Sequence, residues 1–222
     1  MTKNTVINFA RLDYLTTAPY LTWRIILIFT AAIAFIAAGT SNTTIIISMC
    51  MMCSVVFACY PFTIGLDTLY FTLPLTKKNV ILGRYVFTIS LNLAMLLVAY
   101  ILSFTMMTIF SKDFDLLVNL LTGLACFGLF TFIEAIQIPI YFKMGYTKAK
   151  FLTYIPLIAF PALIIAVTTF INEDKLFSTL TNIFTWIENN IIITVLACVA
   201  VWLGMMCLSM LISLKFYAKR EF

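Results

Sequence analysis

The sequence predicts an all-α integral membrane protein with a single transmembrane domain over residues 1–222, and three observations lead to this prediction. Hydrophobic residues make up 63% of the chain and charged residues only 10%, with a mean hydropathy of +1.08. A water-soluble domain needs more polar groups to cover its surface. Six apolar runs are each long enough for the ~20 helical residues that cross a bilayer core. The basic residues also fall almost entirely on one side of a six-span arrangement. The predicted spans cover residues 20–38, 45–64, 80–108, 116–141, 152–171 and 191–214.

The distribution of charge predicts the orientation of these six spans. Of the 14 Lys and Arg residues, only Lys112 and Lys175 lie on one side of the arrangement. The same side carries five acidic residues, namely Asp113, Asp115, Glu173, Asp174 and Glu188. The positive-inside rule therefore puts the opposite side, with both chain termini, in the cytoplasm. This distribution explains the net charge of +5 without a nucleic-acid partner.

Composition also limits the chemistry that the chain can perform. It has no histidine, which removes metal–histidine sites, Ser–His and Cys–His catalysis and histidine proton relays. No Gly-x-x-x-x-Gly-Lys sequence is present to form a P-loop for ATP. All six cysteines fall within apolar runs, and the Cys50–Cys53 pair has no second ligand pair, which favours packing over a metal or redox site. We therefore expect no catalytic residue, metal or cofactor on this chain.

Residues 3–15 form a moderately amphipathic segment before the first span. Asn8 and Arg11 lie opposite an apolar face, while Asp13 intrudes on that face. The residues of the apolar face are Val6, Ile7, Phe9, Ala10 and Tyr14. Such a segment is predicted to lie in the membrane interface rather than to cross the bilayer.

The stretch 67–85 joins the second and third spans with more than a short polar hinge. Apolar residues recur at helical spacing as far as Leu73, and Pro74 then ends that helix because it lacks an N–H. Thr76 is placed to cap a second helix, which begins with two lysines. Cations are unfavourable at a helix N-terminus, so anionic lipid heads or a partner protein are expected to hold them there. We interpret the stretch as a coupling element, with an ordinary connecting loop as the alternative.

The last external connection, residues 172–190, is longer than the others. Its apolar residues Leu176, Leu180, Phe184 and Ile187 repeat at helical spacing. This predicts an amphipathic extracellular helix between the fifth and sixth spans, lying against the outer leaflet or re-entering it. A plain interfacial helix and a lid over an exit path both fit this pattern.

Glu134 is the only acidic residue well inside a predicted span, and Gln137 follows it one turn later. A charged side chain at the bilayer centre costs about 2.5–3.5 kcal/mol on insertion scales. Glu134 is therefore expected to face a protein interior or an aqueous cavity, or to be protonated. One interpretation is an inward-facing substrate cavity or pivot at Glu134 and Gln137, and the other is a structural hydrogen bond to a neighbouring helix.

Two segments of the chain resemble the type-2 ATP-binding cassette (ABC) exporter permeases. Residues 66–85, LDTLYFTLPLTKKNVILGRY, are similar to their cytoplasmic loop, which has an "LP-[ST]-[RK]" core and a downstream "GRY" or "ARY". Residues 138–150, IPIYFKMGYTKAK, are similar to the "PLxFKFGYxKA" loop of the small six-span branch of that superfamily. Thr76 and Lys77 stand where Ser and Arg are commoner.

The resemblance implies an elbow helix at residues 3–15 and a coupling helix at about 67–75, in a permease of the bacterial plasma membrane. It implies two copies of an ABC ATPase subunit, which would hold ATP and Mg, and a second copy of this chain or a related permease. Permeases of this branch export amphipathic peptides, such as phenol-soluble modulins in staphylococci, or act in antimicrobial-peptide immunity. The implied ATPase contacts are Asp67, Leu69, Tyr70, Leu73, Pro74, Leu75, Thr76, Lys77 and Lys78, the implied elbow residues are Phe9, Arg11 and Tyr14, and the second cytoplasmic loop contributes Lys143, Tyr146 and Lys148.

Two other classes of function compete with an exporter subunit. A nucleotide-independent carrier or channel would be expected to show ionisable residues and broken helices at matched positions of two halves. This chain shows one intramembrane acid and no internal repeat. An intramembrane enzyme is favoured least, since the sequence has no histidine, metal cluster or acid pair.

Overall fold

The computed structural model describes residues 4–20, 22–39, 43–63, 76–111, 115–145, 149, 151 and 190–218, and every regular element in these ranges is helical. The predicted fifth span and nearly all of the predicted external helix therefore lie outside the described residues. In chain order the elements are α1 (Asn4–Thr17), the short 3-10 helix η1 (Ala18–Tyr20), α2 (Trp23–Gly39), α3 (Thr43–Thr63), α5 (Lys77–Ile109), α6 (Leu116–Met144) and α9 (Ile191–Ala218).

Four of the described helices, α3, α5, α6 and α9, are long and apolar enough to cross a membrane. The 33 residues of α5 extend over about 50 Å at 1.5 Å per residue, more than the ~30 Å of a hydrocarbon core. The helix α2 is also apolar but has only 17 residues. These helices fall where the sequence places five of its six spans, while the number of spans and their orientation stay predictions.

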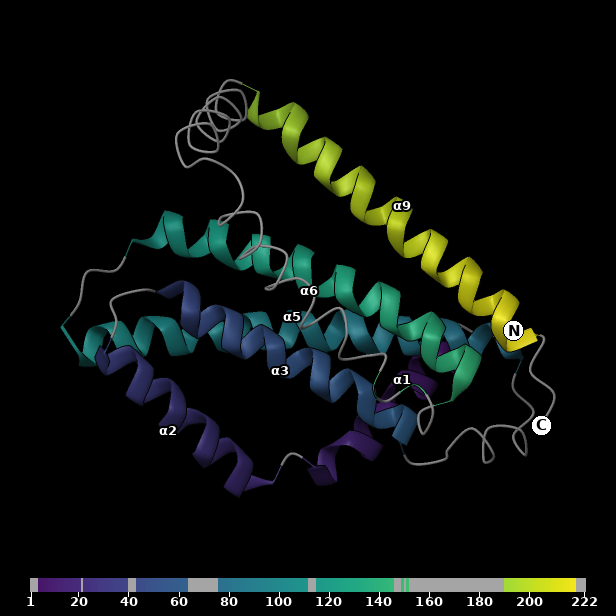
Figure 1. Cartoon of the computed structure of the whole chain (residues 1–222), viewed down its shortest axis with the longest axis horizontal. Coiled ribbons are helices and arrows are strands. Elements are labelled where there is room, and N and C mark those ends of the chain that lie inside the picture. Colours follow the sequence, from purple (N-terminus) through teal and green to yellow (C-terminus); the bar gives the residue numbers. More distant parts are fainter. Residues whose placement is uncertain are drawn as a thin grey trace.

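The bundle is centred on α3, α5 and α6, and α9 packs against α6 at an angle, so that the start of α9 diverges from the bundle (Figure 1). One group of buried apolar residues, which includes Phe9, Tyr85 and Tyr217, joins α1, α3, α5, α6 and α9 at one end. A second group, which includes Ile33 and Met51, joins α2, α3 and α5 toward the other end. The elements are thus held by two apolar clusters, of which the first also surrounds the polar contacts described below.

Two helix boundaries follow directly from local sequence. Asp115 caps α6, because its side-chain oxygen accepts hydrogen bonds from the backbone N–H of Leu117 and Val118 at 2.9 and 3.3 Å. Gly145 ends α6 with a φ of 72°, a left-handed conformation that favours glycine. Thr76 occupies the N-cap position of α5 as predicted, and its carbonyl oxygen accepts the first bond of the helix from Asn79 N at 2.9 Å, but its side chain makes no capping hydrogen bond.

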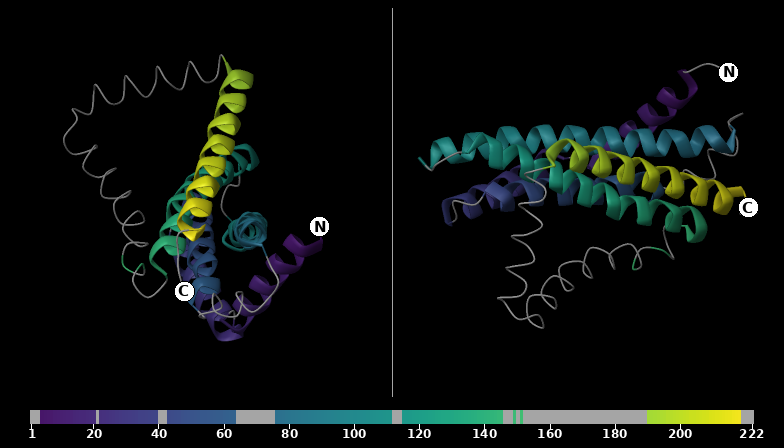
Figure 2. Two further views of the ribbon diagram at one scale, coloured as in Figure 1. Left: turned by 90° about the vertical axis from the view of Figure 1, so that its right-hand side faces the viewer. Right: turned by 90° about the horizontal axis from the view of Figure 1, so that it is seen from above.

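The start of α5, the ends of α6 and α9 and the helix α1 all lie at one end of the molecule (Figure 2). Lys77 Nζ donates to the carbonyl oxygen of Ala218 at 3.5 Å, and Lys143 Nζ lies 5.2 Å from the centroid of the Phe216 ring. We call this the basic end of the bundle, defined by Lys77, Lys78, Lys143 and Lys215. It corresponds to the side that charge distribution predicts to be cytoplasmic.

Candidate functional site

Three consecutive residues near the start of α5, Gly83, Arg84 and Tyr85, are all buried and each contacts a different neighbour. Gly83 is where α1 comes closest to α5: a Cβ atom added to it would lie 2.5 Å from Phe9 Cδ1. Such a distance is far below an ordinary carbon–carbon contact, so any larger residue would push α1 away. Glycine at this position is therefore required by the packing of the two helices.

Arg84 forms a buried ion pair with Asp13 of α1. Its Nε lies 3.4 Å from Asp13 Oδ2, and the two side chains are 1% and 0% exposed. The guanidinium carbon also lies 4.3 Å from the centroid of the Phe62 ring of α3 and 5.9 Å from that of Phe9. Cation–π attraction of this kind adds to the ion pair. One side chain of α5 thereby links α1 and α3.

Tyr85 connects α5 to α9 and, through α9, to α6. Its hydroxyl lies 2.6 Å from Ser209 Oγ and 3.0 Å from Ser213 Oγ, and Ser209 Oγ donates to the carbonyl oxygen of Ala135 at 2.5 Å. Because a serine hydroxyl has one proton, Tyr85 donates to Ser209 and accepts from Ser213. We call Gly83, Arg84, Tyr85, Asp13 and Ser209 the hub, since together they join α1, α5, α6 and α9 with Phe62 of α3.

The helix α1 makes further contacts with α5 beyond the hub. Tyr14 donates a hydrogen bond to Ser90 Oγ at 2.9 Å, and its ring meets that of Phe87 edge-on at 4.8 Å between centroids. Of the residues expected in the elbow helix, Phe9 is buried and Tyr14 contacts α5, while Arg11 is exposed. Ile7, which the helical wheel put on the apolar face, is 62% exposed. Asp13, the irregularity on that face, pairs with Arg84 and so helps to fix α1 to α5.

The predicted ATPase contacts are only partly described. Asp67, Leu69, Tyr70, Leu73, Pro74 and Leu75, with Tyr146 and Lys148 of the second loop, lie outside the described residues. Thr76, Lys77 and Lys78 are exposed at the start of α5, and Lys143 is exposed in the last turn of α6. Arg84 follows Lys77 by about 10 Å along the helix axis. The stretch predicted to couple is therefore joined directly to the hub.

Glu134 lies in a second polar cluster, deeper in the bundle. Asn92 Nδ2 of α5 donates to Glu134 Oε2, and Ser54 Oγ of α3 donates to Asn92 Oδ1. Glu134 is 1% exposed, Gln137 is 3% exposed, and within the described part of the chain no hydrogen-bond donor reaches Glu134 Oε1. The cluster links α3, α5 and α6. None of the three surface grooves found among the described residues is lined by Glu134 or Gln137. A role for these two residues in a substrate path stays a prediction.

Most of the partners in these two clusters have no signal in the local sequence. Arg84 falls among the basic residues of a predicted cytoplasmic connection, and no pattern predicts a role for Ser54, Asn92 or Ser209. The only local signal was the position of Asp13 on the apolar face of its helix. A buried carboxylate is stabilised by a cation, and Arg84 of the GRY sequence supplies one to Asp13.

These helices and their contacts define a multi-pass α-helical membrane protein, in which a short amphipathic helix is locked to the start of a long span. Among the described residues, no group of histidine, cysteine or acidic side chains is arranged to hold a metal ion.

Comparison with known families identifies the protein more closely. A family model described as "ABC-2 family transporter protein" matches residues 11–218, and the chain therefore belongs to the ABC-2 transporter family. Members are the transmembrane permease components of ABC transporters, and ATP is hydrolysed on a separate subunit. Comparisons with curated proteins and with solved structures gave no match.

Proposed function

We propose that this ABC permease is an exporter subunit for amphipathic or hydrophobic peptides, such as phenol-soluble modulins or antimicrobial peptides. In this proposal the stretch 67–78 contacts the ATPase subunits and transmits their ATP-driven conformational change to the membrane helices. The exporter contains two ATPase subunits, which bind ATP and Mg, and two permease chains, either identical or related. It works in the bacterial plasma membrane.

The observation that carries the proposal is the hub, directly after the coupling stretch. A displacement at Lys77 reaches Gly83, Arg84 and Tyr85 after about two turns of a rigid helix. There α5 is held to α1 by the Asp13 ion pair, to α3 by the Phe62 ring and to α9 by two hydroxyl groups. Packed protein interiors transmit strain because they are nearly incompressible. The start of α5 cannot move without moving these neighbours.

The cargo class rests on different support. The loops at 66–85 and 138–150 resemble those of the small six-span exporters, whose known cargoes are amphipathic peptides. Exposed apolar residues are also abundant along α5, α6 and α9. Such a surface is compatible with a hydrophobic cargo, and contact with lipid requires the same kind of surface.

The test is a reconstitution of the permease with the ATPase that co-purifies from the native host. The cargo probe is a fluorescent phenol-soluble modulin, and the readouts are ATPase binding, ATP hydrolysis and peptide export in vesicles. We expect a Tyr70→Ala, Leu73→Ala variant to lose export while the protein stays folded. The matched control is Leu97→Ala, which removes an exposed side chain from α5 far from the coupling stretch.

Two outcomes would count against the proposal. Normal ATPase binding and normal export by the Tyr70→Ala, Leu73→Ala variant would show that the coupling stretch is assigned wrongly. Export by the permease alone, without ATPase or nucleotide, would favour a nucleotide-independent carrier.

A further inference from the structure

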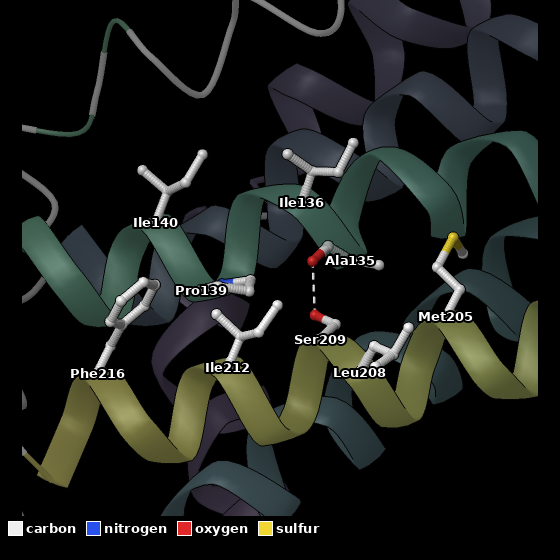
Figure 3. A pocket seen from close by; sticks show the side chains of 9 residues that line it. All are labelled: Ala135, Ile136, Pro139, Ile140, Met205, Leu208, Ser209, Ile212 and Phe216. Atoms are coloured by element: carbon white, nitrogen blue, oxygen red, sulfur yellow. Dashed lines mark hydrogen bonds between the residues drawn. The ribbon is translucent and has the colours of Figure 1, made fainter.

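A groove runs along the seam between α6 and α9, on the outer surface of the helices that the structure describes. Its walls are formed by Ile136, Pro139 and Ile140 of α6 and by Leu208, Ile212 and Phe216 of α9 (Figure 3), and this open groove has a volume of about 350 Å³. Ser209 also lines it, but its hydroxyl proton is donated across the seam to the carbonyl oxygen of Ala135. The wall therefore offers an apolar surface without a free hydrogen-bond donor.

The length of the groove along the helices is close to the hydrocarbon thickness of one lipid leaflet. Its lining on α9 runs from Met205 to Phe216, which is about 16 Å at 1.5 Å per residue. A hydrocarbon core is ~30 Å thick, so this length is close to half of it. The Phe216 end of the groove lies at the basic end of the bundle, where the headgroups of that leaflet would be.

The ammonium group of Lys143 lies at that end of the groove. Lys143 is exposed, and its Nζ lies over the Phe216 ring, which is itself part of the groove wall. In the described part of the chain no carboxylate lies within ion-pair distance of Lys143. Of the acidic residues described there, Asp13 pairs with Arg84, Glu134 is buried and Asp115 caps the opposite end of α6. None of the acidic residues that the structure describes therefore neutralises the charge of Lys143.

We propose that the α6–α9 groove binds an anionic phospholipid, with an acyl chain along the apolar wall and the phosphate at Lys143. An acyl chain has no polar group to satisfy, whereas an extended peptide in this groove would leave backbone N–H and C=O groups unpaired in hydrocarbon. A helix is about 10–12 Å across and would lie over the groove rather than within it. Anionic headgroups are also the ligands expected for basic positions between helices at the cytoplasmic surface.

The experiment is native mass spectrometry of the full-length chain, purified and offered phosphatidylglycerol or phosphatidylcholine with matched acyl chains. We expect selective retention of phosphatidylglycerol. Lys143→Ala and Ile212→Trp are expected to weaken it about tenfold, a difference of ~1.4 kcal/mol in binding free energy. Lys143→Arg keeps the charge and is expected to retain the lipid.

Matched controls separate the groove from its surroundings. Leu211→Trp adds the same side chain at an exposed neighbour that does not line the groove, and Lys78→Ala removes another exposed cation from the basic end. Neither is expected to change retention. Lys143→Ala changes only an exposed side chain, so it tests the site even if Ile212→Trp does not fold.

Three results would overturn the proposal. One is equal retention of the two lipids, and another is unchanged retention by Lys143→Ala. The third comes from disulfide cross-linking in a chain whose six native cysteines have been replaced. Efficient cross-linking of Ile136→Cys to a cysteine in residues 152–171, or to the same position of a second copy, would show that protein fills the groove. None of these readouts requires transport, so the result is independent of the proposed export function.

Discussion

Asp13 and Arg84 lie 3.4 Å apart, Oδ2 to Nε, between the amphipathic helix α1 and the start of α5, and both are almost completely buried. This pair makes α1 a helix that is packed on a membrane span and not only a helix at the membrane surface. A helix with a weak apolar face would be held at a membrane surface by shallow insertion alone. Here it is bound to a span by a desolvated charge pair, by Phe9 against Gly83 and by Tyr14 against Ser90. The helix α1 is thus a fixed part of the bundle.

Removing Asp13 is expected to destabilise the protein strongly. Asp13→Ala leaves the Arg84 guanidinium buried without its carboxylate, and loss of one partner of a buried pair costs about 3–5 kcal/mol. For a chain of this length, each kcal/mol of lost stability lowers the Tm by about 2–4 °C. Thermal unfolding in detergent measures it. Arg11→Ala, at an exposed position of the same helix, serves as the control, and equal Tm values for both variants would contradict the prediction.

The partner substitution tests whether the charge pair, rather than the space it fills, matters. We expect the double variant Asp13→Leu, Arg84→Met to be more stable than Asp13→Ala, because apolar groups of similar size often replace a buried ion pair at little cost. A double variant less stable than the single one would show that Arg84 has another essential contact. The Tm of both variants in the same detergent decides between these outcomes.

Enlarging Gly83 should separate α1 from α5. Gly83→Ala puts a methyl group 2.5 Å from Phe9 Cδ1, and overpacking of this kind costs about 1–3 kcal/mol. Gly128→Ala is the control, because a Cβ at Gly128 of α6 meets no atom within 4 Å. There, alanine should be neutral or stabilising, since it favours helix more than glycine does. In a double-mutant cycle with Phe9→Ala, Gly83→Ala should cost less where the Phe9 ring is absent, and this coupling would locate the clash, whereas strictly additive effects would contradict it.

Tyr85→Phe should weaken the link between α5 and α9 without disrupting packing. The phenol donates to Ser209 and accepts from Ser213, and a hydrogen bond contributes about 0.5–1.5 kcal/mol net. We expect a small loss of Tm but, under the proposed function, a larger loss of export per ATP hydrolysed. Tyr100→Phe, which removes an exposed hydroxyl bonded to the carbonyl of Leu120, is the control. An unchanged ratio of export to ATP hydrolysis would mean that Tyr85 does not transmit the conformational change of the ATPase.

The cluster around Glu134 makes a separate prediction. Asn92→Leu removes the donor to Glu134 Oε2 and the acceptor of Ser54, and leaving a buried polar group unsatisfied costs about 1–3 kcal/mol. Asn92→Leu combined with Glu134→Leu removes both partners and should recover part of that loss. A double-mutant cycle on unfolding in detergent measures the coupling. Strictly additive effects would show that the two side chains do not act as a unit.

Much of the fold was predictable because its signals are local. Apolar runs gave the positions of α3, α5, α6 and α9, and Asp115 and Gly145 mark the two ends of α6 by their own chemistry. The site was less predictable. The break in hydrophobicity around Thr76 predicts that a helix starts there, and α5 does, but the capping hydrogen bond expected from the Thr76 side chain is not formed.

By itself the sequence determined that this is a membrane protein, where its long helices lie and where its basic residues concentrate, since a bilayer requires a fixed length of apolar helix and sorts charge by side. Only the tertiary structure decided that Asp13 meets Arg84, that Tyr85 reaches Ser209 and that Asn92 bridges Ser54 and Glu134. These pairs depend on how each helix is rotated about its axis against its neighbours. In a helix that is apolar all round, hydrophobicity does not specify that rotation, and side-chain packing and the pairing of buried polar groups do.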